Sequence, residues 1–198
     1  MATPTTPGLL STREFQAFID AIGAQCRAGM EAVAAGHDAP PAYQLPGYLT
    51  RAQLDQIPSP VLQVLDTNSR RPTEDQLADN VATVAPAAER CADGGMSPTD
   101  FTNLVDQQIE ENLSRFHQAM DVLVTNLEVL GQQHQDWREV IMQVFSAVSD
   151  FETGLWQQAT TYLYKLGQDP RNLYRGVAST FGGFEQQVGN FFANLEDG

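Results

Sequence analysis

The fold is decided by residues 97–167, which read SPTDFTNLVDQQIEENLSRFHQAMDVLVTNLEVLGQQHQDWREVIMQVFSAVSDFETGLWQQATTYLYKLG. Large apolar residues recur in two long segments of this stretch, at alternating spacings of about three and four. Such spacing places them on one face of a helix and is typical of helices that pack side by side in a coiled-coil-like manner. The run 131–135 is the only break between the segments. The stretch therefore predicts two long helices, about 98–130 and 136–166, folded back on each other as an antiparallel hairpin.

Helix-starting signals mark both members of this hairpin. Ser97 is placed to cap the first helix, Pro98 occupies its first position, and Asp100 lies at its positive end. Asp136 is the predicted cap of the second helix, and Gly167 ends it. The two helices are thus expected to match in length, as a hairpin requires.

A third long helix is expected over residues 171–195. Its apolar residues again share one face: Leu173, Val177, Phe181, Phe184, Val188, Phe191 and Leu195. Between Arg175 and Glu196 the only charged residue is Glu185, and glycines lie among the aromatic residues. Each interior glycine costs a helix about 1 kcal/mol relative to alanine. This combination makes the third helix the most unusual part of the chain.

Two interpretations of the third helix are open. In the first, its phenylalanines belong to the core and Gly182-Gly183 bends the helix over it. In the second, the segment contacts a second copy, another protein, or an apolar or lipid surface. The predicted contact residues are Phe181, Gly182, Gly183, Phe184, Phe191 and Phe192.

The first part of the chain mixes helical and irregular signals. Residues 1–8 are rich in Thr and Pro and are expected to form an unstructured arm. Ser11 and Glu14 form a capping-box pattern that starts a helix over about 12–35. Prolines interrupt residues 37–60, which are expected to wrap around the helices.

Shorter elements are predicted after this connection. Thr50 and Gln53 repeat the capping-box pattern, and residues 61–65 suit a short helix or an isolated strand. A polar turn over 68–72 leads to a helix over about 74–92, which Thr73 caps and Pro86 kinks or divides. The sequence as a whole predicts an all-α protein with an N-terminal part (1–95) and a hairpin with a third helix (96–198). Together these parts are expected to form one compact, coiled-coil-like three- or four-helix bundle.

Composition argues against several classes of function. The formal net charge is −14, and an acidic surface repels phosphate backbones, so we expect no nucleic-acid partner. The chain has no apolar run long enough to span a membrane, and its first residues lack the pattern of a secretory signal. The expected location is cytoplasmic, with leaderless export left open.

Motifs for catalysis or metal binding are absent. The three histidines, His37, His117 and His134, form no metal-ligand pattern, and no nucleotide-binding loop or nucleophile elbow occurs. His117 is expected to share a hydrogen bond with Asp121, one helical turn away. Cys26 and Cys91 are expected to be buried apolar residues. We therefore predict no cofactor, no metal and no enzymatic activity.

The expected function is structural. Helical faces of this kind suit a protein that self-associates or binds another protein. One alternative is an amphipathic protein that coats an apolar or lipid surface through residues 171–195. A second alternative is a metal-binding helical bundle, or a small enzyme, that uses His117.

Overall fold

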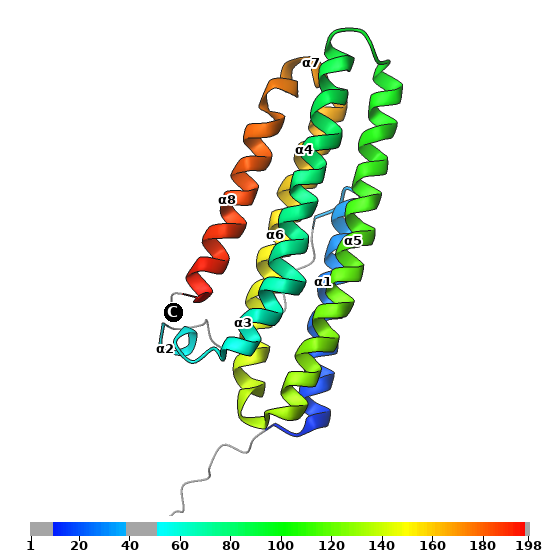
Figure 1. Cartoon of the computed structure of the whole chain (residues 1–198). Coiled ribbons are helices and arrows are strands. Elements are labelled where there is room, and N and C mark those ends of the chain that lie inside the picture. Colours follow the sequence, from blue (N-terminus) through cyan, green and yellow to red (C-terminus); the bar gives the residue numbers. More distant parts are fainter. Residues whose placement is uncertain (1–9, 39–50, 197–198) are drawn as a thin grey trace, which may run out of the picture.

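Figure 1 shows the computed structural model, which describes residues 10–38 and 51–196. Every regular element in these ranges is helical, which confirms the all-α prediction. Five helices in the described ranges pack against one another: α1 (Thr12–Ala34), α4 (Arg71–Ala92), α5 (Pro98–Gln133), α6 (Arg138–Gln168) and α8 (Val177–Glu196). Shorter elements connect them: α2 (Arg51–Leu54), α3 (Ser59–Leu65), η1 (Asp66–Arg70), η2 (Gln135–Trp137), α7 (Pro170–Leu173) and η3 (Tyr174–Gly176).

The long helices lie along one common direction and give the molecule an elongated shape (Figure 1). α5 and α6 run antiparallel and pack against each other. α1 packs on both of them, α4 packs along α5, and α8 packs mainly on α4. The N-terminal helix and the C-terminal helix therefore cover different sides of the central α5–α6 pair.

The predicted starts of α1 and α5 are confirmed. The hydroxyl of Ser11 accepts a hydrogen bond from the backbone N–H of Glu14 at 3.3 Å, and the Glu14 carboxylate accepts one from the Ser11 N–H at 2.9 Å. The hydroxyl of Ser97 accepts from the Asp100 N–H at 3.1 Å. The predicted Asp136 cap is wrong, because Asp136 lies inside the 3-10 turn η2 and α6 continues directly from that turn without a side-chain cap.

The chain between residues 59 and 92 differs from the prediction. No polar turn separates 61–65 from the next helix, because α3, the π-helix η1 and α4 follow one another without a break. Thr73 is buried in the first turn of α4 and does not cap it. Pro86 lies within α4 on its exposed side, and α4 is not divided there.

The third predicted helix is shorter than expected. Residues 170–176 form α7 and the 3-10 turn η3, and α8 begins at Val177. The Tyr162 hydroxyl of α6 donates to the Leu173 carbonyl at 3.3 Å, so a side chain of α6 is bonded to the backbone just before the turn. After this interruption α8 runs beside α4 and makes less contact with α6.

Some predictions fall on residues that the structure does not describe. These are the arm over 1–8, the cap at Thr50 and the 39–50 part of the proline-rich connection. The division of the chain at residue 95 stays a prediction. Across it, α1 packs on α5 and α6, and α4 packs on α5 and α8.

Candidate functional site

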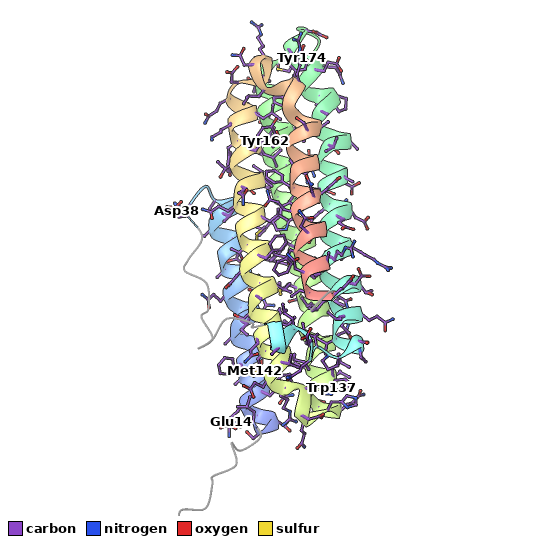
Figure 2. The ribbon with its side chains drawn as sticks, turned by 90° about the vertical axis from the view of Figure 1, so that its left-hand side faces the viewer. Glu14, Asp38, Trp137, Met142, Tyr162 and Tyr174 are labelled. Carbon is purple, nitrogen blue, oxygen red and sulfur yellow. The ribbon has the colours of Figure 1, made fainter. Side chains whose placement is uncertain are left out.

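The aromatic residues of α8 lie mainly inside the molecule. Phe181, Phe184 and Phe192 are buried, and Phe181 has no exposed surface. The half-buried Phe191 stacks on Phe151 of α6, with ring centroids 4.1 Å apart and ring planes at 2°. Figure 2 shows ring side chains filling the space between α6 and α8. The phenylalanines predicted as partner contacts therefore pack within this chain, and the core interpretation describes their position in the folded protein.

The outer face of α8 is small and nearly uncharged. Gly182 and Gly183 are exposed, Gly189 is half-buried, and a Cβ atom added at any of the three would meet nothing within 4 Å. The other exposed residues of this helix, apart from Glu185 and Glu196, are short or carry amides: Ala178, Ser179, Gln186, Gln187, Asn190, Ala193 and Asn194. Packing among the described residues therefore gives no reason for glycine at these three positions.

A second unusual feature is a carboxyl group in the interior. Glu152 of α6 is only 3% exposed. Its Oε1 accepts hydrogen bonds from the Ser69 hydroxyl at 2.5 Å and from the Thr73 hydroxyl at 3.0 Å. Burial raises the pKa of Glu152, and the two hydroxyl hydrogen bonds offset part of this rise. These contacts join α6 to the segment where η1 passes into α4.

Buried amides extend this polar interior towards α5. The side chains of Asn80 and Asn112 exchange hydrogen bonds at 3.0 and 2.9 Å. Gln76 donates to the backbone carbonyl of Asn112 at 2.7 Å, and Gln108 donates to the Asn112 side chain at 3.4 Å. Because buried polar groups are costly unless paired, this network favours one alignment of α4 against α5.

Sequence analysis missed this polar interior, although the spacing signal is present. Four polar residues, Ser69, Thr73, Gln76 and Asn80, follow one another at the same alternating spacing as an apolar row, and all four are buried. Glu152 likewise lies one turn from Val148 and from Leu155, which both belong to the apolar row of α6. A search limited to apolar residues cannot detect such a row.

The predicted hydrogen bond between His117 and Asp121 is not formed. Asp121 instead accepts from Arg27 of α1 at 3.0 Å, and the Nε2 of His117 lies 3.7 Å from the Glu31 carboxylate. In the described ranges no group of three or more His, Cys, Asp or Glu residues is placed to hold a metal ion. Cys26 and Cys91 are both buried, as expected, and neither forms a disulfide.

A cleft at the end of the molecule does not add a group of side chains that are free to bind a ligand. It lies between the loop before α5 and the turn after α6, and its lining includes Ser97, Asp169 and Arg171. The Ser97 hydroxyl donates to the Asp100 carboxylate at 2.7 Å, and Asp169 accepts from Asn172 at 2.8 Å. The Ser97 hydroxyl and the Asp169 carboxylate are thus already bonded within the chain.

Comparisons with protein-family models, with curated proteins and with solved structures gave no match to this chain. Among the residues that the structure describes, none of the helices combines the length and apolar character needed to cross a lipid bilayer. Function must therefore be argued from the geometry of α8 and of the polar interior.

Proposed function

We propose that this protein is a non-enzymatic structural protein that self-associates, or binds another protein, through helical faces, with the outer face of α8 as the first candidate. Three glycines of α8 lie at positions where this chain places no neighbouring atom. Each costs about 1 kcal/mol relative to alanine in a helix. A closely approaching helix from a second copy or a partner gives a physical reason for residues without a Cβ atom.

Charge supports the same proposal. Of the exposed residues on α8 only Glu185 and Glu196 are charged, whereas the chain as a whole carries a net charge of −14. Two copies of such an acidic protein repel each other except where charges are sparse. The exposed side chains of Val122 and Val129, one heptad apart on α5, provide a second uncharged surface, which is apolar. On this proposal, α8 and α5 make coiled-coil-like contacts along these faces.

Alanine substitutions at the three glycines test this function. In the variant Gly182→Ala, Gly183→Ala, Gly189→Ala we expect the free energy of unfolding of the monomer to rise by about 1–3 kcal/mol, because helix propensity improves without a clash. Association is expected to weaken, because three added methyl groups keep a second helix away. Light scattering after size exclusion, over a range of concentrations, measures the mass, and urea unfolding measures stability.

The control is Gly154→Ala on α6. A Cβ atom there also meets nothing within 4 Å, so this variant should gain stability without losing association. If the wild-type protein has a mass near 21.7 kDa at all concentrations, self-association is rejected. If the triple variant gains stability and associates as before, the face of α8 is rejected as the contact.

Coating of an apolar or lipid surface by residues 171–195 is the second candidate. In the part of the chain that the structure describes, α8 is held to α4 and α6 mainly by apolar contacts. Its side-chain polar contacts to other elements lie near its two ends, where Thr180 bonds with Tyr162 of α6 and Glu196 pairs with Arg70 of η1. A lipid surface can replace such contacts without leaving buried polar groups unpaired. Cosedimentation with zwitterionic liposomes tests this candidate, and failure to bind removes it.

The acidic surface supports our inference that nucleic acid is not a partner. We keep the cytoplasmic location and the lack of enzymatic activity as predictions. Metal analysis of the purified protein tests the alternative of a metal centre at His117, and bound metal in a stoichiometric amount would favour that alternative.

A further inference from the structure

Glu152 is a buried acid without a cationic partner among the described residues. The ion pairs between described residues leave it out and are instead formed at or near the surface: Arg27–Asp121, Arg70–Asp66, Arg70–Glu74, Arg70–Glu196, Arg71–Asp66, Arg115–Asp79 and Arg115–Glu111. A neutral carboxyl group can accept the hydrogen bonds of Ser69 and Thr73 with little penalty. A charged one loses its hydration and keeps only these two hydroxyl hydrogen bonds in return, which is unfavourable in the interior.

The titratable groups around Glu152 do not change this conclusion. From α1, Cys26 donates to the backbone of Ser149, one turn before Glu152. Burial raises the pKa of the Cys26 thiol to about 12, so this group is neutral. His117 of α5 lies next to Glu31 of α1. The charged groups of η1, α4 and α8 near this level belong to the Arg70 cluster, and those on α6 beside Glu152 include the exposed Asp150.

The two bonds of Glu152 reach only one side of the molecule. Ser69 belongs to the π-helix η1 and Thr73 to the first turn of α4. α8 packs on α4 and η1. α1 is bonded to α6 by other groups, since the Tyr164 hydroxyl donates to the Ala34 carbonyl at 2.6 Å and Arg138 donates to the Leu10 carbonyl at 2.6 Å. The hydrogen bonds of Glu152 thus tie η1 and α4, and α8 that packs on them, to α6, whereas α1 has hydrogen bonds of its own to α6.

We propose that Glu152 forms a pH-sensitive contact: in its neutral form it holds η1, α4 and α8 against α6, and its ionisation loosens this layer. A π-helix is a rare, single-turn irregularity that often occurs at functional positions, which suits η1 as the point of movement. Loosening exposes the aromatic face of α8, which the folded protein keeps inside. This regulation goes beyond the proposed function and does not depend on it.

The direction of the pH effect follows from proton linkage. A glutamate in an unfolded chain has a pKa near 4.5, and burial raises the pKa of Glu152 above that value. The folded protein therefore binds more protons than the unfolded chain between these two pKa values. The stability contributed by neutral Glu152 is fully present below the unfolded pKa and is lost as the pH rises through the folded pKa.

Glu152→Gln is the decisive variant. The glutamine side chain keeps an oxygen that can accept from Ser69 and Thr73, but it does not ionise. We expect the urea midpoint of the wild-type protein to fall as the pH is raised above the unfolded pKa of 4.5, with rising fluorescence of an added hydrophobic dye, and both changes to be smaller in the variant. Glu139→Gln, an exposed position on the same helix, serves as the control and should behave like wild type.

Hydrogen exchange locates the change. After correction for the intrinsic effect of pH, protection at the higher pH should fall in residues 66–92 and 177–196 and persist in 12–34. Equal pH dependence in wild type and Glu152→Gln would overturn the proposal, as would uniform loss of protection. If the variant does not fold, the proposal is tested in the wild-type protein by following the NMR shift of the Glu152 carboxyl carbon against pH. A titration midpoint near 4.5 would refute the proposal. These measurements are made at concentrations where the protein has the mass of a monomer. A pH effect at Glu152 is then distinguished from an effect of self-association.

Discussion

Arg138 is a buried cation bonded to neutral oxygen atoms. It is 2% exposed and donates to the Gly131 carbonyl at 2.7 Å, to the Leu10 carbonyl at 2.6 Å and to the Thr12 hydroxyl at 2.8 Å. The Gly131 carbonyl lies near the C-terminal end of α5, where the helix dipole favours a positive charge. The guanidinium also lies 5.7 Å from the centre of the Phe15 ring. One side chain thus joins the start of α1, the end of α5 and the start of α6.

We predict that Arg138→Met lowers the free energy of unfolding by about 2–4 kcal/mol. The methionine fills part of the volume but leaves two backbone carbonyls without their donor. Urea unfolding followed by circular dichroism measures the effect. Arg13→Met, at an exposed position of α1, is the matched control and should change stability by less than about 0.5 kcal/mol. Equal losses in the two variants would contradict this role for Arg138.

Gly131 is a second residue whose identity is fixed by packing at the same end of the molecule. A Cβ atom there would lie 2.1 Å from a carbon of the Phe15 ring. Glycine is thus required by the close approach of α1 to the end of α5. This glycine contrasts with Gly182 and Gly183 of α8, where the chain itself leaves the space open.

At the scale of elements, α4 carries an internal proline. Pro86 lacks the backbone N–H that would bond to the carbonyl one turn earlier, and its ring crowds that turn. The proline is exposed, while its neighbours Val84, Ala87 and Ala88 are buried. Packing of these neighbours keeps α4 helical through a position that sequence analysis treated as a kink or a division.

Pro86→Ala is expected to raise the free energy of unfolding by about 1–3 kcal/mol, because it restores a helical hydrogen bond and removes a poor helix former. The urea midpoint measures the change. Pro98→Ala is the control, since Pro98 occupies the first turn of α5, where proline is well tolerated and little gain is expected. A loss of stability in Pro86→Ala would show that α4 needs its proline geometry.

At the scale of the whole molecule, negative charge is in large excess. The chain has 25 acidic residues and 11 Lys and Arg residues. The surface ion pairs, such as Arg115 with Asp79 and Glu111, are partly exposed and contribute little each. Mutual repulsion of carboxylates is therefore the dominant electrostatic effect on the folded state near neutral pH.

We predict that added sodium chloride stabilises the protein near pH 7. Salt shortens the range of repulsion to about 10 Å at 0.1 M and less at higher concentration. The urea midpoint should rise with salt while the slope of the transition stays constant. A midpoint that falls with salt would mean that the ion pairs outweigh the repulsion.

Local signals let the sequence determine much of the helical architecture. Ser11 with Glu14, and Ser97 with Asp100, mark the starts of α1 and α5 through contacts only three residues apart. The long apolar rows of α5 and α6 predict their buried faces for the same reason. The predicted boundaries of α6 and α8 differ more from the structure, because the turns η2 and η3 depend on contacts between distant residues, such as that of Tyr162 with Leu173.

The tertiary structure alone decided which groups meet. It placed Glu152 under the hydroxyls of Ser69 and Thr73, about eighty positions away in sequence. It also covered the phenylalanines of α8 with α4 and α6 and left the glycines outside. The helical class and the net charge can be read from the sequence, since they depend on local spacing and on composition. Pairing of distant faces depends on the packing of all five helices at once, and no local pattern contains it.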